Sequence, residues 1–356
     1  MPISKSIANR LLILQAIHGD ELMPVSDSMP DDVRIMSEAI GLLGERLKAR
    51  IDLGNCGTAM RFLTAYCAQL EGQTVILDGI ERMHHRPIGQ LVDALREIGA
   101  DIEYLSKEGF PPLKIKGCIL DKHRIVTINN PQSTQFVSAM FLIGANAQTN
   151  STSPYITLTR ELIQRYTTLH NSTQRYTIEK DWSSAAFWYE YVALHGGEIT
   201  LPGLSRDSLQ GDKVVADIFA HLGVQTEYTA EGITIVSTGV ADLQRSDLQG
   251  IDARSTAQRS AEEILHQDFS ACPDLYPAVA LTCERLGVEL HATGVESLPL
   301  KESDRLRAVR EHRTDADHRM AMALLIAGYE VDDTACISKS YPQFIEQWKS
   351  VNTSNE

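Results

Sequence analysis

The feature of this sequence that most constrains its fold is a repeated pattern, with one copy in each half. The first copy runs from Asp93 to Tyr104 and the second from Asp217 to Tyr228, and Glu-Gly and an apolar run follow each. Both copies show helical apolar spacing, a glycine that ends the helix, a strand, a turn and a second strand. The pattern indicates either a duplicated architecture or two unrelated α/β units that look alike.

Helices and short strands alternate along the rest of the chain. Apolar residues spaced about 3.6 apart predict helices at 5–17, 32–43, 58–70, 88–98, 134–146, 184–195, 212–222, 274–286, 303–312, 318–327 and 342–350. Short β-like runs predict strands at 74–77, 101–104, 113–115, 125–128, 198–201 and 232–236. With 356 residues, the chain is long enough for two α/β domains.

Composition excludes several classes of protein. The 33 Lys and Arg residues against 47 Asp and Glu give a formal net charge of −14, which argues against a nucleic-acid or anionic-membrane binder. No apolar run approaches the roughly 18 residues of a membrane span, and the first residues are a poor signal peptide. The six cysteines form no CxxC pair, so we expect a reducing cytoplasm and neither a zinc site nor a disulfide framework.

Two motifs near the beginning of the chain lie at predicted helix N-termini, where free backbone N–H groups favour the binding of anions. One contains cations and the other contains glycines. Ser4-Lys5-Ser6 precedes a helix that carries Arg10, and either serine is a candidate cap. Leu53–Arg61 contains two glycines that permit a tight turn before a helix beginning at Thr58. Its spacing fits neither a Walker loop nor GxGxxG. On these residues alone, a capped surface helix with solvated cations is the better explanation of the first motif, and a lone glycine turn does not by itself indicate a site.

Further motifs of this kind are Arg82–Pro87, Ser133-Thr134-Gln135, Pro273-Asp274, Lys301–Arg305 and Asp317–Met322. Arg86 precedes a helix, where its planar fork suits an anion. Lys301 and Arg305 are four residues apart and would share one face of a helix, with Glu302 beside them as a candidate proton carrier. Helix capping and ordinary ion pairing are the plain alternatives.

In combination and in this order, the motifs resemble those of the 5-enolpyruvylshikimate-3-phosphate synthase family. The resemblance is carried by SKSIANR, LGNCGTAMR, ERMHHRPIGQLVDALREIGA, STQF, LQGD, PD, KESDRL, DHRMAM and the lysine of CISKS. It runs from Ser4 almost to the C-terminus. The co-occurrence of KESDRL and DHRMAM makes it specific.

The resemblance implies a two-domain α/β fold, the inside-out α/β barrel of enolpyruvyl transferases. Each domain would hold three related helix-and-strand units, with inner helices and outer sheets. The domains are expected at 4–179 and 180–356, with residues 1–3 as the remnant of a leading strand and the crossover near Glu179–Asp181. The active site would lie in the cleft between the domains, which closes around the substrates.

The resemblance also implies a reaction. Such enzymes transfer the enolpyruvyl group of phosphoenolpyruvate to the 5-hydroxyl of shikimate 3-phosphate and release phosphate, in the pathway to chorismate and aromatic amino acids. They need no metal and no organic cofactor. We expect a cytoplasmic monomer whose partners are these two small molecules. Together the substrates carry roughly five or six negative charges, which explains clustered cations in an acidic protein.

Each matching residue acquires an implied role. The phosphoenolpyruvate site would contain Lys5, Gly57, Arg86, Gln135, Arg305, Arg319 and Lys339. The shikimate 3-phosphate site would contain Lys5, Ser6, Arg10, Ser133, Thr134, Gln135, Tyr155, Asp274 and Lys301. Asp274 would be the general base for the attacking hydroxyl. Glu302, together with Lys5, would protonate the methylene carbon and later remove that proton.

The chain also departs from the family pattern. Phe62 stands where proline is usual, Ser297 where asparagine is common and Thr134 where serine is common. The chain is short, and the contractions fall after Gly44, where the usual strand pair is not expected, and within 161–175 and 310–316. Two alternatives remain: the sister enzyme that acts on UDP-N-acetylglucosamine, and a degenerate homologue that binds anions without turnover.

Overall fold

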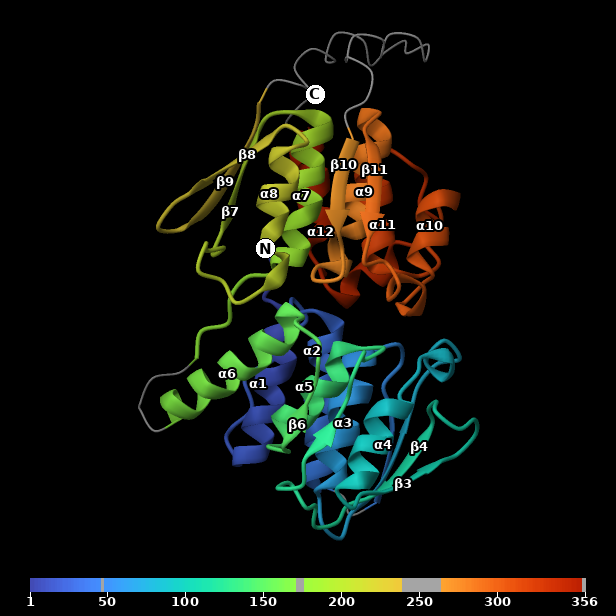
Figure 1. The fold of residues 1–356 in the computed structure, drawn as a ribbon. Coiled ribbons are helices and arrows are strands. Elements are labelled where there is room, and N and C mark those ends of the chain that lie inside the picture. The colour runs from blue at the N-terminus through green and yellow to red at the C-terminus, as the bar shows by residue number, and fades with distance from the viewer. Residues whose placement is uncertain (46–47, 171–175, 239–263, 354–356) are drawn as a thin grey trace. The chain divides into compact units, whose positions relative to one another are not determined.

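The structure is a computed structural model that describes residues 1–45, 48–170, 176–238 and 264–353 (Figure 1). The chain divides into two compact units, which are considered separately. The N-terminal unit comprises Ile3–Ile178, and the C-terminal unit comprises Met1–Pro2 with Glu179–Glu356. The end of the contracted segment at 161–175 lies outside the described residues, as do residues 46 and 47. None of the described helices is long and apolar enough to cross a membrane.

The N-terminal unit alternates helices and strands. Its described helices are α1 (Lys5–His18), α2 (Asp31–Glu45), α3 (Gly57–Ala68), α4 (Gly89–Glu97), α5 (Thr134–Leu142) and α6 (Pro154–His170), with a 3₁₀ turn η1 (Met83–His85). Its described strands are β1 (Lys48–Asp52), β2 (Thr74–Asp78), β3 (Asp101–Tyr104), β4 (Leu113–Lys116), β5 (Val126–Thr127) and β6 (Ala147–Gln148). A four-stranded sheet has the order β1-β2-β4-β3, and only its β1–β2 pair is parallel. β5 and β6 form a separate parallel pair.

Two helices of the N-terminal unit are buried on all sides. Residues 7–14 of α1 and every residue of α3 except Thr58 are buried. A helix that is apolar all round belongs in the interior, and α3 packs against α1, α5, β2 and β4. The side chains of β2 alternate between buried and half-buried, as expected for a strand with one face on the core.

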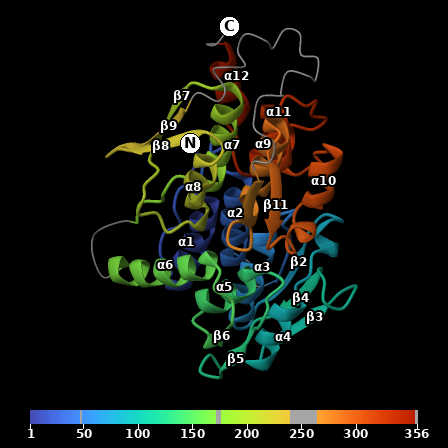
Figure 2. The ribbon, with the colours of Figure 1, turned by 45° about the horizontal axis from the view of Figure 1, so that its top comes forward.

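The C-terminal unit is built on similar lines. Its described helices are α7 (Trp182–His195), α8 (Val215–Ala220), α9 (Tyr276–Leu286), α10 (Arg305–Glu311), α11 (His318–Ile326) and α12 (Phe344–Thr353), with 3₁₀ turns η2 (Gly211–Val214), η3 (Pro273–Leu275), η4 (Leu298–Leu300) and η5 (Ala335–Lys339). Its described strands are β7 (Glu198–Pro202), β8 (Val224–Tyr228), β9 (Gly232–Ser237), β10 (Ile264–Asp268) and β11 (Glu289–Thr293). Residues 182–193 of α7 are all buried. The sheet β7-β9-β8 covers one side of α7, and α9 and α11 pack on other parts of it (Figure 2).

The repeat in the sequence corresponds to a repeat in the structure. The first copy forms α4, β3 and β4, and the second forms α8, β8 and β9. Gly99 (φ 103°) and Gly223 (φ 84°) follow the two helices, and this region of φ favours glycine. In each copy, the second strand of the repeat lies between two antiparallel neighbours. β4 lies between β2 and β3, and β9 lies between β7 and β8. The shared strand order and orientation favour the duplicated architecture over a chance likeness.

Several elements are not predicted from the sequence. α6 was missed because threonines interrupt its apolar face, and β10 and β11 because histidine and other polar residues break their alternation. β1 was missed because Lys-Ala-Arg-Ile-Asp contains no apolar run. Its pairing with β2 corrects the expectation that the contraction after Gly44 removes the strands there, since at least one remains.

Candidate active site

The predicted site residues fall into two sets, one in each unit. The N-terminal unit holds Lys5, Ser6, Arg10, Gly57, Arg86, Ser133, Thr134, Gln135 and Tyr155, and the C-terminal unit holds Asp274, Lys301, Glu302, Arg305, Arg319 and Lys339. In the C-terminal set, ion pairs link Asp274 with Lys301, Arg305 and Arg319, and Arg305 with Glu302. Within the described residues, no group of three His, Cys, Asp or Glu side chains is placed to ligate a metal ion.

Arg10 is a buried cation on α1, with a side chain among the largest that are fully buried. Its guanidinium donates to Thr159 Oγ1 (2.7 Å), the Ser6 carbonyl (2.8 Å) and Ser138 Oγ (3.2 Å). These acceptors are all neutral, and no carboxylate of the described residues pairs with Arg10. Burial lowers the pKa of Arg10 to about 10, which reflects the cost of a desolvated charge.

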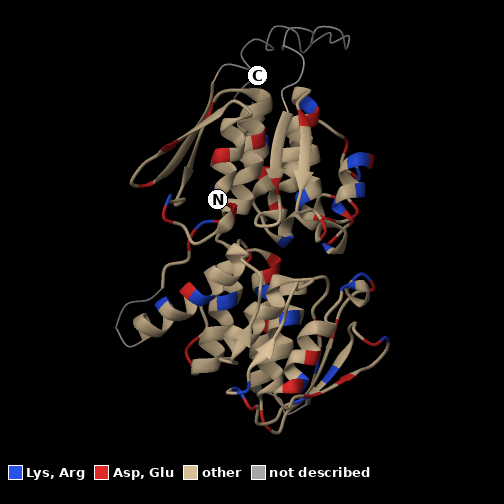
Figure 3. Ribbon diagram, in the orientation of Figure 1, with Lys and Arg blue, Asp and Glu red and all other residues tan. Residues whose placement is uncertain are grey.

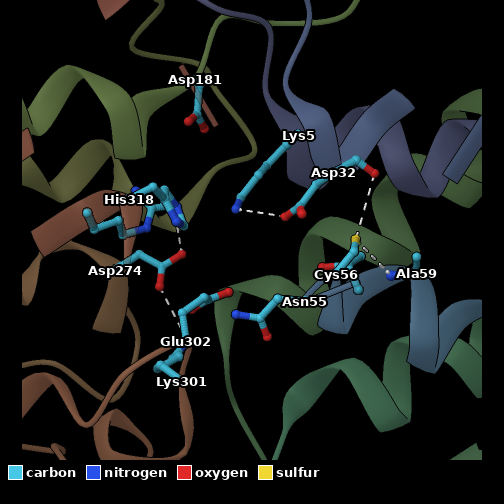
Figure 4. Close-up of polar contacts among 12 residues, drawn as sticks. Lys5, Asp32, Asn55, Cys56, Ala59, Asp181, Asp274, Lys301, Glu302 and His318 are labelled. Carbon is cyan, nitrogen blue, oxygen red and sulfur yellow. Dashed lines mark hydrogen bonds and ion pairs between the residues drawn. The ribbon is translucent and has the colours of Figure 1, made fainter. Parts of the chain in front are cut away.

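The start of α1 supplies a second cation, Lys5. Its Nζ lies 3.0 Å from Asp32 Oδ2 at the start of α2, and the two side chains are 12% and 3% exposed (Figure 4). The predicted serine cap is wrong: Ser4 is the N-cap residue, but its side chain makes no capping hydrogen bond, and Ser6 lies inside the helix. The first backbone N–H groups of α1 therefore receive no hydrogen bond from the Ser4 side chain.

The glycine motif forms a turn that brings an arginine against the backbone. Gly54 has a φ of 54°, and Cys56 caps α3 by accepting from the Ala59 N–H at 3.4 Å (Figure 4). Arg86 donates to the Asn55 carbonyl at 3.2 Å. A Cβ added to Gly57 would lie 2.6 Å from Arg86 Cζ, so only glycine lets the guanidinium approach this closely. α3 begins at Gly57, one residue earlier than predicted.

Arg61 is a residue of this cluster to which the sequence analysis gave no role. Its Nη1 donates to Gln135 Oε1 at 2.8 Å, and Gln135 Nε2 donates to Thr58 Oγ1 at 2.8 Å. These two hydrogen bonds fix the orientation of the Gln135 amide. Its place at the end of the LGNCGTAMR motif is the sequence feature from which a role for Arg61 could have been predicted.

The hydroxyl groups of the N-terminal set lie at the starts of α5 and α6. Ser133 caps α5 by accepting from the Gln135 N–H at 3.4 Å, and Thr134 is the first residue of that helix. Tyr155 lies in the first turn of α6, and its carbonyl accepts from Thr159 Oγ1 at 2.7 Å. Thr159 also holds Arg10, so it links these two predicted residues.

In the C-terminal unit, three cations converge on Asp274. Its Oδ1 lies 3.3 Å from Lys301 Nζ and 2.8 Å from Arg305 Nη1, and its Oδ2 lies 2.9 Å from Arg319 Nη2. Lys301 is not on a helix with Arg305, as predicted, because it has extended backbone before α10 begins. The two cations meet through Asp274 instead.

Arg305 is surrounded by carboxylates. Besides Asp274, it contacts Asp317 Oδ2 through Nε at 2.8 Å and Glu302 Oε2 through Nη2 at 3.2 Å. Burial acts against the charge, but Asp317 and Asp274 more than offset it and raise the pKa of Arg305. Basic and acidic residues lie close together on and around α10, as the ribbon coloured by charge shows (Figure 3).

Arg319 on α11 pairs with only one described carboxylate, that of Asp274, and two of its buried donors have no partner in the described part of the chain. Asp317 caps this helix by accepting from the Arg319 N–H at 3.0 Å. The Nε and Nη1 atoms of Arg319 are buried, and they have no hydrogen-bond partner among the described residues. Buried N–H donors are normally paired, so each of these two groups is available to donate to a ligand oxygen.

Two further groups are Asp212, a carboxylate outside the predicted set that interacts with Asp274, and Lys339, the last member of the set. Burial, followed by repulsion from Asp274, raises the pKa of Asp212 to about 7. Lys339 ends η5 and is followed by buried Tyr341, which donates to Gln347 Oε1 at 2.6 Å and accepts from Trp188 Nε1 at 3.0 Å. These bonds anchor the segment that carries Lys339.

This mixed α/β fold is the fold of solved EPSP synthase structures. A solved EPSP synthase from Acinetobacter baumannii has a TM-score of 0.64 and 18% identity, and the match covers 98% of this chain and 94% of that one. At this identity the likeness shows the fold.

The sequence shows the family. The chain matches the family described as EPSP synthase (3-phosphoshikimate 1-carboxyvinyltransferase) over residues 1–312 and 311–348. It belongs to the EPSP synthase family.

Curated relatives agree over nearly the full length. A 3-phosphoshikimate 1-carboxyvinyltransferase from Bacteroides fragilis is 35% identical, with 97% of this chain and 92% of the relative covered. One from Colwellia psychrerythraea is 28% identical, with 99% and 96% covered. The match with the Bacteroides protein extends over 404 residues, more than the 356 of this chain, in agreement with contracted internal segments.

Proposed function

We propose that this chain transfers the enolpyruvyl group of phosphoenolpyruvate to the 5-hydroxyl of shikimate 3-phosphate and releases phosphate. Membership of the EPSP synthase family supports this reaction, which makes the chain a transferase of the shikimate pathway of aromatic amino-acid biosynthesis. The two substrates carry about five or six negative charges at neutral pH. An enzyme for them needs local positive charge, whatever its net charge.

The observation that carries the proposal is that buried arginine donors lack anionic partners. Arg10 is buried among neutral oxygens, and Arg319 has two buried donors without a partner in the described chain. A buried charge without a carboxylate partner, as at Arg10, costs several kcal/mol. Arg319 is paired with Asp274, but its two unpaired buried donors carry a desolvation penalty of their own. Folding alone gives no reason for such groups. Anionic substrates supply the reason.

In the N-terminal unit, the proposed shikimate 3-phosphate ligands are Lys5, Ser6, Arg10, Ser133, Thr134, Gln135 and Tyr155. The proposed phosphoenolpyruvate ligands there are Lys5, Arg86, Gln135 and the backbone at Gly57. The closeness of Arg86 to Gly57 supports this assignment, because an anion on the guanidinium would then also meet backbone N–H groups.

In the C-terminal unit, Arg305 and Arg319 are proposed to bind the carboxylate of phosphoenolpyruvate, Lys339 its phosphate and Lys301 shikimate 3-phosphate. Planar forks suit carboxylates. Asp274 takes the proton of the 5-hydroxyl as its oxygen attacks C2 of phosphoenolpyruvate. The cations around Asp274 favour its ionised form, which a base requires.

Glu302 is proposed to deliver a proton to C3 in the same step, which gives a tetrahedral intermediate. It then takes a proton back from C3 as the C2–O bond to phosphate breaks. One carboxylate thereby acts as acid and then as base. Lys5 is proposed to assist it and to neutralise the departing phosphate.

The finer architecture belongs to the same proposal. We infer two domains that form an inside-out α/β barrel arrangement and close on the substrates, with the active site in the cleft between them. The helices buried on all sides in each unit, α1, α3 and α7, support inner helices and outer sheets. We also infer a cytoplasmic monomer that requires no metal or organic cofactor.

Phosphate release with both substrates tests the proposal, with Lys5→Ala and Glu302→Ala as site controls. We expect turnover by the wild type and loss of at least 100-fold in each variant. Binding of both substrates without turnover would select a degenerate homologue instead. Turnover with UDP-N-acetylglucosamine in place of shikimate 3-phosphate would select the sister activity.

A further inference from the structure

The surroundings of Arg10 raise the question of what stabilises its charge before a substrate arrives. A guanidinium has five N–H donors, and three of them bond to Thr159 Oγ1, the Ser6 carbonyl and Ser138 Oγ. One N–H on each terminal nitrogen is therefore not used by the described residues. All three acceptors are neutral oxygens, and such oxygens compensate a buried charge only in part.

The guanidinium of Arg10 lies over the face of an aromatic ring. Arg10 Cζ lies over the ring of Phe62 at 5.1 Å from its centroid. Phe62 lies on α3, which packs against α1, and its side chain is 1% exposed. An aromatic face carries partial negative charge and attracts a cation within about 6 Å, most strongly where water is excluded.

We propose that Phe62 is a positioning residue whose ring face acts as a neutral counter-ion and keeps Arg10 buried, charged and ready to bind shikimate 3-phosphate. The inference rests on the proposed function for the identity of the ligand. A carboxylate in place of Phe62 would occupy the in-plane N–H donors and repel an anionic substrate. The ring attracts the charge through its partly negative face. Unlike a carboxylate, it offers no lone pairs that would occupy the remaining N–H donors, so these stay available for the ligand.

Arg305 shows the contrasting arrangement in the same chain. It is as deeply buried as Arg10, but three carboxylates, those of Asp274, Glu302 and Asp317, take up its donors. A substrate anion must compete with those carboxylates at Arg305. At Arg10 it meets no such competitor among the described residues, because the aromatic face provides the compensation.

The proposal has a measurable consequence for substrate affinity. Without the ring's attraction, the unpaired charge favours conformations in which Arg10 moves toward water, and the apparent dissociation constant rises as the competent fraction falls. For a desolvated cation–π contact we expect a loss of about tenfold in affinity for shikimate 3-phosphate. The kcat at saturation and the KM for phosphoenolpyruvate remain within about twofold, because the reacting groups are untouched.

Site-specific replacement of Phe62 by mono-, di- and trifluorophenylalanine in the full chain separates electrostatics from packing. Fluorination drains the ring face of negative charge and nearly preserves its size. We expect the KM for shikimate 3-phosphate to rise in steps with each fluorine. The same series at Phe219, which is buried against Tyr189 in the C-terminal unit, is the matched control and should leave this KM unchanged. A KM independent of fluorination at Phe62 would overturn the proposal.

A second measurement needs no substrate. Urea unfolding of the fluorinated series is repeated with Arg10→Met, which forms a double-mutant cycle. In the protein that retains Arg10, we expect fluorination at Phe62 to lower the urea concentration at the unfolding midpoint. In the Arg10→Met background, we expect fluorination to leave this midpoint unchanged. Equal effects in both backgrounds would mean that the ring contributes packing alone. If wild-type protein fails to bind shikimate 3-phosphate, the proposed function fails, whereas this cycle still decides whether Phe62 stabilises Arg10.

Discussion

Replacing Glu302 with glutamine tests whether a catalytic carboxylate and a substrate carboxylate compete for one arginine. Glu302 Oε2 lies 3.2 Å from Arg305 Nη2, and the two side chains are only 10% and 1% exposed. Because phosphoenolpyruvate is proposed to place its carboxylate on Arg305, it meets donors that are already engaged. Removing the charge of Glu302 should therefore favour substrate binding and, at the same time, remove the proton carrier.

The expected magnitudes follow from the hydrogen bond to Arg305. A hydrogen bond that involves a charged group contributes about 1.5–3 kcal/mol, and a pair in which both partners are charged lies toward the upper end of this range. Glutamine retains an acceptor oxygen but loses the charge, so Arg305 is held less firmly by about 1 kcal/mol. Phosphoenolpyruvate should then bind roughly fivefold more tightly, whereas kcat should fall by about 10²–10⁴.

Calorimetric titration of phosphoenolpyruvate in the presence of shikimate 3-phosphate measures the first effect, and phosphate release measures the second. Glu311→Gln is the matched control. Glu311 is also on α10, but it is 46% exposed and lies 3.9 Å from Arg307, so neither quantity should change. Unaltered or weaker phosphoenolpyruvate binding by Glu302→Gln would refute the competition, and an unaltered kcat would refute the role in proton transfer.

Three further changes probe the site and the core. Gly57→Ala should raise the KM for phosphoenolpyruvate about tenfold in steady-state assays, because a Cβ 2.6 Å from Arg86 Cζ must displace that guanidinium; an unchanged KM would contradict this. Asp317→Asn should destabilise the protein by about 1.5–3 kcal/mol in urea unfolding, because a neutral amide replaces one of the three carboxylates that pair with buried Arg305; a loss below about 0.5 kcal/mol would contradict it. Glu190→Gln should stabilise the protein at neutral pH, because burial raises the pKa of the Glu190 carboxyl well above its ordinary 4.5. As pH rises above about 4.5, the wild type loses stability relative to this variant by up to about 1.4 kcal/mol per pH unit. The difference in unfolding free energy between the two proteins should therefore grow from pH 4 to pH 8. A constant difference would refute a raised pKa at Glu190.

Local pattern was enough to predict most elements of the fold. The repeat at Asp93 and Asp217 predicted α4, β3 and β4 and their counterparts α8, β8 and β9, because glycine stops and apolar spacing depend on neighbours in the chain. β1 and β10 were not predicted, because they are stabilised by pairing with β2 and β11 rather than by a strand-like pattern of their own residues.

Motif order likewise led to the proposed site residues, but the sequence did not predict their surroundings. Lys301 and Arg305 were placed on one helix face by their spacing, whereas Lys301 is extended and meets Arg305 through Asp274. Arg61 received no role, although its hydrogen bond fixes the amide of Gln135. Spacing along the chain does not report contacts between segments 74 residues apart.

The sequence by itself determined the family, the order of the motifs and the repeated helix-and-strand unit, since these depend on residue types at short separations. Only the tertiary structure decided which cations are compensated. Arg305 is enclosed by three carboxylates, whereas Arg10 rests on neutral oxygens and the ring of Phe62. The energy of a charge depends on burial and on the groups within a few ångströms, which folding brings together from distant parts of the chain.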